Sequence, residues 1–164
     1  MFNIKDMSED KGVKLTYLVI EREAFNVIGI RLITPYGGGT WGIVKNDGTN
    51  NLAKELFGQF FDLGLCFGFE EDGSNDYMCA VASNQETPGA FDSFTFPATN
   101  WLKFEAIGTI TGQTLTQVWE CINTEYLPQS DYKQSHLPTI EKYISWDEAA
   151  DICNVEIWIP VYLK

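Results

Sequence analysis

Two carboxylates in the C-terminal part of the chain each lie two residues before an aromatic side chain. Glu156 precedes Trp158 within the apolar run 154–161, and Glu141 precedes Tyr143 in the segment before it. Side chains alternate between the two faces of a β-strand, so each acid shares a face with its ring. A carboxylate beside aromatic rings attracts a hydrophobic cation, and each cation–π contact contributes about 0.5–2 kcal/mol. From alternation alone, the Glu156 face is either the solvated side of a sheet or the wall of a ligand site.

The sequence contains only weak matches to motifs for catalysis, metal binding or phosphate binding. A Ser-His-Asp triad would have to use His136, the one histidine, whose Pro-containing surroundings indicate a surface loop. The four cysteines form no C-x-x-C pair, and we expect small buried hydrophobes without zinc. The glycines at 37–39 lack the lysine of a phosphate-binding loop, and the acidic stretch 70–76 indicates a hairpin turn rather than an EF-hand. The sequence predicts neither a metal nor a cofactor.

Composition predicts one globular domain with a sizeable core. The chain has 164 residues, of which 45% are hydrophobic. Its formal charge is −12, from 11 basic and 23 acidic residues, and such a field repels nucleic acid and anionic lipid. No apolar run reaches the roughly 20 residues of a membrane span. We therefore expect a cytoplasmic protein that binds neither nucleic acid directly nor membranes.

The elements that must position these residues follow one order twice. After a polar segment, 1–14, the first half spans about 15–82, a linker covers 83–97, and the second half spans 98–164. In each half, hydrophobic periodicity predicts strand, helix, strand, strand. The predicted strands are 15–20 with 24–33, 65–69, 77–82, 101–110, 139–144 and 153–163, and the predicted helices lie within 50–64 and 115–126.

Several details of this order are also predicted. We expect a loop over 35–50, an N-cap at Asn50 or Asn51, and a helix end at Leu127-Pro128. The run 104–108 resembles 25–29 in composition and in the place of its glycine, which indicates a duplication. The fold class is α+β, with duplicated βαββ units that pack as one domain because neither half buries its apolar face alone.

The second half also resembles a known family. The order of the helix with its Leu-Pro end, the Glu-x-Tyr strand 141–143 and the run Glu156-Ile-Trp-Ile-Pro160 resembles the effector-binding domain of AraC- and MerR-type multidrug regulators. Stand-alone members are called GyrI-like small-molecule-binding proteins. The resemblance implies a pseudo-twofold pair of βαββ units whose two antiparallel sheets form a central cleft for hydrophobic cations. It also implies that Glu156 and Glu141 are the acidic positions of this cleft and that Tyr143 and Trp158 belong to its aromatic walls. The further candidate ligand-binding residues are Trp119, whose place on the apolar helix stripe favours core packing, Met78, the counterpart of Glu156 in the first half, and Phe69.

Three hypotheses about function follow. The first is a stand-alone small-molecule effector-binding protein for a hydrophobic, cationic or aromatic ligand. We expect no DNA-binding helices before Leu15, so a transcriptional role would need a partner or would be absent. The second is a hydrolase of small electrophilic compounds that uses a cleft glutamate. The third is an acidic protein-interaction or inhibitor module.

Overall fold

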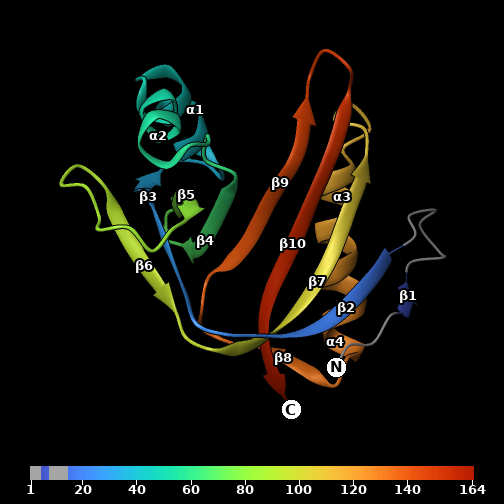
Figure 1. Ribbon diagram of the computed structural model, residues 1–164. Coiled ribbons are helices and arrows are strands. Elements are labelled where there is room, and N and C mark those ends of the chain that lie inside the picture. The colour runs from blue at the N-terminus through green and yellow to red at the C-terminus, as the bar shows by residue number, and fades with distance from the viewer. Residues whose placement is uncertain (1–4, 8–14) are drawn as a thin grey trace. The chain divides into compact units, whose positions relative to one another are not determined.

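The computed structural model describes residues 5–7 and 15–164, and these residues form two compact units. The rest of the predicted polar segment, 1–4 and 8–14, lies outside the described residues. Unit 1 combines the N-terminal strands up to residue 22 with residues 99–136 and 141–164. Unit 2 comprises residues 23–98 and 137–140. Figure 1 labels the elements of both units.

An antiparallel sheet forms one layer of unit 1. Its strands lie in the order β1, β2, β7, β10, β9, and the short β8 pairs with the end of β10. The bounds are β1 (Lys5–Met7), β2 (Leu15–Arg22), β7 (Thr99–Gly108), β8 (Tyr132–Gln134), β9 (Thr139–Asp147) and β10 (Ile152–Leu163). β2 directly precedes β3 in the sequence, yet it pairs with β7, with Tyr17 opposite Phe104. The long β7–β10 pairing runs from Cys153 opposite Gly108 to Val161 opposite Asn100.

One face of this sheet is covered by the helical segment α3 (Thr114–Cys121), the π-helical turn η2 (Ile122–Tyr126) and α4 (Leu127–Gln129). The predicted helix 115–126 is therefore present, and its second part is a π-helix. A short helical turn that contains Pro128 follows the π-helix directly. Alternate apolar residues of the strands pack against this segment. The core comprises Leu15, Tyr17, Leu102, Phe104, Ala106, Val118, Cys121, Ile122, Tyr126, Cys153, Val155, Ile157, Ile159 and Val161.

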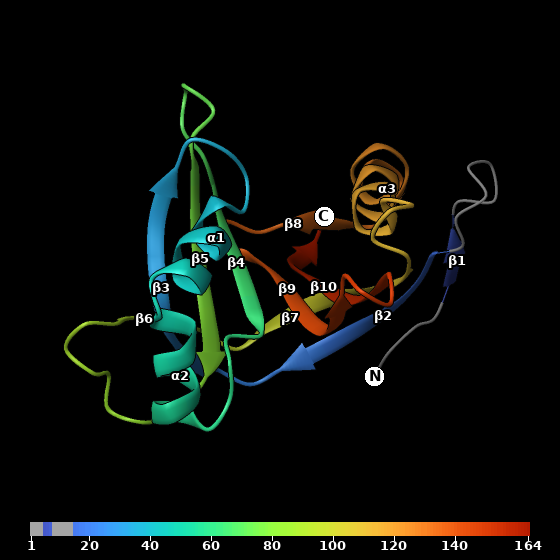
Figure 2. The same ribbon diagram turned by 90° about the horizontal axis from the view of Figure 1, so that it is seen from above.

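Unit 2 has a second antiparallel sheet, with strand order β4, β5, β3, β6. The bounds are β3 (Phe25–Thr34), β4 (Leu63–Phe69), β5 (Asn75–Ala82) and β6 (Asp92–Phe96). Helices α1 (Gly39–Asn46) and α2 (Thr49–Phe57) pack on one face, as Figure 2 shows. The buried residues of this core are Ile28, Val44, Ala53, Phe61, Tyr77, Cys79, Val81 and Phe91.

Two local predictions for unit 2 were wrong. Residues 39–46 form helix α1 instead of a loop, and tertiary burial of Thr40 and Val44 outweighs the low helix propensity of the glycines. α2 begins after Gly48 and ends at Gly58, whose φ of 79° favours glycine, so neither Asn50 nor Asn51 is the N-cap. Within the segment predicted as a linker, β6 pairs with β3.

The α+β fold class and the internal duplication are confirmed. In unit 2, β3, the helices, β4 and β5 follow one another, and the sheet order is β4, β5, β3. In the C-terminal half, β7, the helices, β9 and β10 follow one another with the corresponding order β9, β10, β7. The same strand-helix-strand-strand order thus gives the same sheet topology twice.

Candidate ligand-binding site

The Glu141 carboxylate, on β9, accepts hydrogen bonds on both of its oxygens. The indole Nε1–H of Trp119, on α3, donates to Oε2 at 2.8 Å, and the Tyr143 hydroxyl donates to Oε1 at 3.0 Å. All three side chains are half-buried. Hydrogen bonds to a charged acceptor are stronger than neutral ones and fix its orientation. Both donors are neutral groups, and together they orient this carboxylate.

Aromatic surface continues from Tyr143 towards solvent. The ring of Trp146 lies edge-on to that of Tyr143, with centroids 5.7 Å apart. Trp146 is 38% exposed, whereas Tyr143 and Trp119 pack against the core of unit 1. We name Glu141, Trp119, Tyr143 and Trp146 the Glu141 cluster. It combines one carboxylate, three rings and a partly exposed edge within a single unit.

Glu156, on β10, has a different environment. Its Oε1 accepts a hydrogen bond from Trp158 Nε1–H at 3.1 Å, and its Oε2 lies 3.2 Å from Lys103 Nζ on β7. Arg22 is a second cation nearby: burial lowers its pKa, and the charge of Glu156 acts in the opposite direction. The Arg22 guanidinium carbon and the Lys103 ammonium lie 5.4 and 5.8 Å from the Trp158 ring centroid. The carboxylate and the indole here already have cations from their own chain.

The two acid–aromatic pairs lie on opposite faces of the sheet of unit 1. Val155 and Ile157 belong to the core against α3, so alternation along β10 turns Glu156 and Trp158 to the other face. Glu141, in contrast, is bonded to Trp119 of α3 and therefore faces the helix. The structure thus brings Glu141, Tyr143 and Trp119 together and separates them from Glu156 and Trp158.

The two candidate residues of unit 2 have contrasting environments. Met78 is fully buried, at 0% exposure, opposite Leu65 and Arg31 in the sheet register. Phe69 is 67% exposed at the end of β4, where the hairpin to β5 begins. Neither residue belongs to the Glu141 cluster as its contacts define it.

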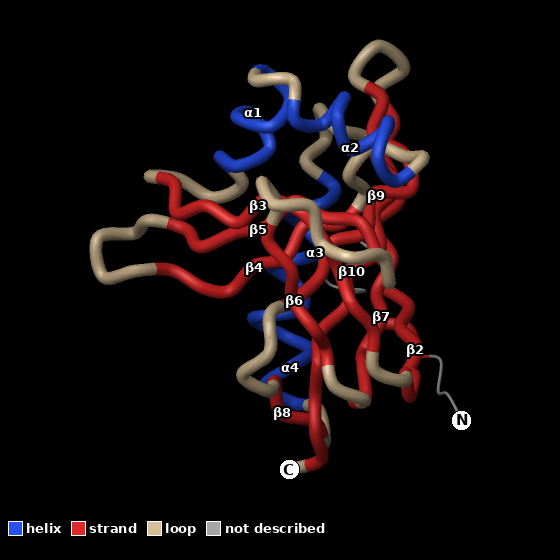
Figure 3. The backbone as a smooth tube through the Cα atoms, turned by 60° about the vertical axis from the view of Figure 1, so that its left-hand side comes forward, coloured by secondary structure: helices blue, strands red, loops and turns tan. Residues whose placement is uncertain are grey.

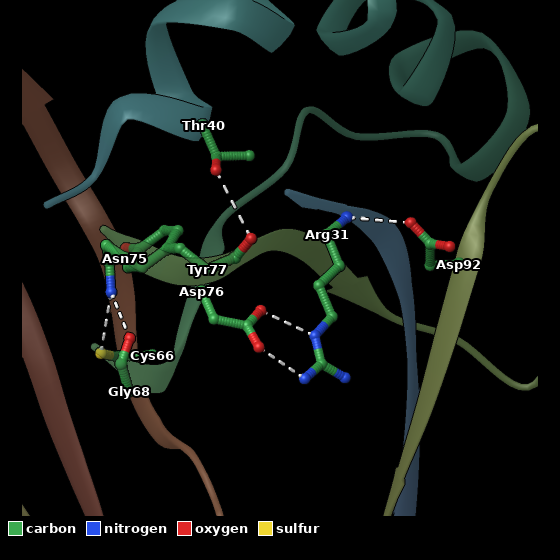
Figure 4. Close-up of polar contacts among 8 residues, drawn as sticks. All are labelled: Arg31, Thr40, Cys66, Gly68, Asn75, Asp76, Tyr77 and Asp92. Carbon is green, nitrogen blue, oxygen red and sulfur yellow. Dashed lines mark hydrogen bonds and ion pairs between the residues drawn. The ribbon is translucent and has the colours of Figure 1, made fainter. Parts of the chain in front are cut away.

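In unit 2, Asp76 is paired with the cation Arg31, as Figure 4 shows. Arg31 donates two hydrogen bonds to Asp76, at 2.9 and 2.8 Å, and its backbone N–H donates to Asp92 at 2.9 Å. The hydrogen bond to Asp76 raises the pKa of Arg31. The guanidinium carbon lies 3.6 Å from the Phe67 ring centroid. A planar guanidinium thus satisfies this carboxylate and stacks on the ring at once.

Sequence reasoning missed Lys103 and Arg22 as partners of the Glu156 face. Lys103 lies directly opposite Trp158 in the β7–β10 register, and Arg22 approaches from β2. A lysine inside the predicted strand 101–110 is the one signal available, and it becomes useful only once the register is known.

The cysteines and His136 have the environments that the sequence predicts. The four cysteines are free, three are buried, and burial raises the pKa of the Cys79 and Cys153 thiols. His136 is exposed. Within residues 5–7 and 15–164, no group of three His, Cys, Asp or Glu side chains is placed to hold a metal ion. None of the helices in the described part of the chain is long and apolar enough to cross a membrane.

The duplicated strand-helix-strand-strand fold is the one expected for the class of small-molecule effector-binding domains. Residues 19–161 match the family Cass2, described as integron-associated effector binding protein. The chain belongs to this family, and its expected relation to the GyrI-like effector-binding proteins is confirmed. Comparison with curated protein sequences yields no match.

Solved structures share the fold. SAV2435 bound to tetraphenylphosphonium is 23% identical, with a TM-score of 0.70 over 89% of this chain and 93% of that one. The integron cassette protein VCH_CASS2 from Vibrio cholerae is 17% identical, with a TM-score of 0.58 over 89% and 95%. The EcmrR C-terminal domain is 14% identical, with a TM-score of 0.63 over 92% and 99%. The family match, together with this fold, confirms the effector-binding hypothesis at the level of the family.

Proposed function

We propose that the effector is a hydrophobic cation and that the Glu141 cluster binds it. The observation that carries this proposal is the carboxylate of Glu141, oriented on both oxygens by the neutral donors of Trp119 and Tyr143. Its negative charge supplies the attraction, while Tyr143 and the partly exposed Trp146 supply ring faces for cation–π contact. Each element of the cluster comes from unit 1, so the recognition of charge needs no residue of unit 2.

The chemistry of the cluster favours a cation with delocalised charge. Both carboxylate oxygens already accept a hydrogen bond, so a ligand without N–H or O–H donors binds there without displacing Trp119 or Tyr143. Tetraphenylphosphonium, the molecule in the SAV2435 structure, is such a cation and also offers four rings. Glu156 has a different role in this proposal: with Lys103, it stabilises the opposite face of the sheet.

We further propose that the protein, once it has bound its effector, acts through a protein partner in the cytoplasm. The formal charge of −12 opposes direct contact with nucleic acid. The four free cysteines suit a reducing compartment. These two features support the place and the manner of action expected from the sequence.

A charge-reversed pair of ligands tests the proposal. Tetraphenylphosphonium and tetraphenylborate have nearly the same size and shape and opposite charges. Titration calorimetry with each ion, together with tryptophan fluorescence, is expected to show binding and quenching for the phosphonium and neither for the borate. Equal affinity for both ions would show that the site recognises hydrophobic surface alone and would refute the role of the carboxylate.

Three single variants then locate the charge. Glu141→Gln keeps the size of the side chain and is expected to weaken phosphonium binding about 10- to 100-fold, because a charge pair near the surface contributes about 1.5–3 kcal/mol. Glu156→Gln is expected to leave the affinity nearly unchanged, since Lys103 already pairs with this acid. Glu148→Gln, in the exposed β9–β10 turn, controls for the same change in net charge. A loss in Glu156→Gln without one in Glu141→Gln would place the site on the other face of the sheet.

A further inference from the structure

A groove opens on unit 1 where α4, β8 and the end of β10 meet, and Figure 3 shows these three elements together. Its volume is about 680 Å³. Tyr132 and Tyr162 are among the residues that line it, and Tyr162 is 48% exposed. The residues lining this α4–β8 groove are Leu127, Pro128, Tyr132, Lys133, Gln134, Tyr162 and Lys164.

The side chains that line the groove include two lysines and no acid. Lys133 and Lys164 flank the apolar surface, and Asp131, which precedes β8, is the one acid next to them in sequence. Acids outnumber bases in the whole chain by 23 to 11. A lysine-flanked aromatic groove on such a protein is complementary to a segment that carries an aromatic residue and acids together.

The β4–β5 hairpin of unit 2 is a segment of this kind. Phe69 is 67% exposed, and Glu70, Glu71 and Asp72 follow it directly. We name residues 69–72 the acidic tip. A ring that is so exposed beside three acids has apolar surface available for a partner.

The acidic tip is held in a defined shape. Glu70 N–H donates to the carbonyl of Ser74 at 2.8 Å, and Gly73 N–H donates to the carbonyl of Glu70 at 3.0 Å. Asp72 accepts the N–H of Ser74 at 2.9 Å. These bonds order the turn before any contact forms, which reduces the entropy lost on binding.

We propose that the acidic tip of one copy of this chain docks in the α4–β8 groove of a second copy. Phe69 packs between Tyr132 and Tyr162, and Glu70 and Glu71 pair with Lys133 and Lys164. The contact is heterologous, since different surfaces of the two copies meet. Repetition of it therefore gives a closed ring or an open chain of copies.

A complementation experiment by sedimentation velocity tests this assembly. The wild-type protein is expected to associate as its concentration rises. Phe69→Ser removes the tip, and the double variant Lys133→Glu with Lys164→Glu removes the groove, so each protein alone is expected to be monomeric. Mixed in equal amounts, they are expected to form a dimer and nothing larger, because one intact tip then meets one intact groove. Phe60→Ser changes another exposed phenylalanine, 44% exposed, and is the control that should associate like the wild type.

Three outcomes overturn the proposal. The first is a wild-type protein that stays monomeric at every concentration. The second is a tip or groove variant that associates as the wild type does. The third is a mixture of monomeric variants that forms no dimer, which would indicate a symmetric contact.

Matched melting temperatures and circular dichroism spectra exclude misfolding of these surface variants. The assembly is measured without ligand, so its failure leaves the proposed cation site untouched, and Glu141→Gln should associate normally.

Discussion

Removal of the charge pair between Lys103 and Glu156 should lower the stability of the fold and leave the affinity for the ligand nearly unchanged. The two side chains are 17% and 19% exposed, and the ammonium lies 3.2 Å from the carboxylate. At this distance, in an effective dielectric constant of about 20, their attraction is about 5 kcal/mol. Loss of hydration by two half-buried charges offsets most of this, and we expect a coupling free energy of about 1–2 kcal/mol.

A double-mutant cycle measures that coupling. Lys103→Met retains the aliphatic stem but removes the charge, and Glu156→Gln retains an oxygen to accept the Trp158 N–H. Free energies of unfolding from urea titrations of the wild type, both single variants and the double variant give the coupling. The same cycle between Lys103→Met and Glu148→Gln, whose carboxyl lies in the β9–β10 turn, is the control and should give a value near zero.

Either of two results would refute this assignment of Lys103 and Glu156. A coupling below about 0.3 kcal/mol lies within the usual error of additivity and would show that the pair does not stabilise the fold. A large loss of phosphonium affinity in Glu156→Gln would show that the ligand competes with Lys103 for this carboxylate. We expect a measurable coupling, with a change in affinity smaller than about twofold.

Three further variants test the fold. A methyl group at Gly29 would overlap the backbone carbonyl of Cys79, so Gly29→Ala should destabilise the protein by about 3 kcal/mol or more. Gly42 lies in open space on α1, so Gly42→Ala should stabilise the protein by about 0.5–1 kcal/mol. Thermal melts of both variants check this, and equal effects on stability would contradict the close approach of the two strands at Gly29. Hydrogen bonds, first from the Thr111 hydroxyl, lower the pKa of Asp151 from 3.8, so its stabilisation is present above that pH and lost as the pH falls through the lowered pKa. Asparagine tolerates the φ of 55° at this position, so Asp151→Asn should keep the backbone conformation. The melting temperature of this variant should therefore be lower than that of the wild type at pH 7, and the difference should shrink below about pH 4. A difference in melting temperature that does not change with pH would contradict this dependence on the ionised carboxylate.

The helices show how far local patterns can be followed. The apolar run 115–126 predicts a helix, and α3 with η2 occupies that segment because its stripe packs on the sheet. Leu52, Leu56 and Phe60 also have helical spacing, yet they are 40%, 40% and 44% exposed. α2 instead buries Ala53, because the short helix contacts the sheet on another side. Periodicity indicates a helix without showing which side meets the sheet.

The sequence by itself determined which acid shares a face with which ring. Alternation along a strand is a local property of the backbone, and both predicted pairs are observed as hydrogen bonds, Glu141 with Tyr143 and Glu156 with Trp158. The repeated order of elements, and with it the α+β class, also follows from local periodicity. These features depend on neighbours within a few residues.

Only the tertiary structure decided what each acid faces. Glu141 meets Trp119 of α3, whereas Glu156 meets Lys103, which a different strand places opposite Trp158. Strand order and register depend on burial of the whole apolar face, and a shift of one residue would reverse every side chain of a strand. The partners that each acid meets therefore depend on long-range pairing, which no local stretch of the sequence encodes.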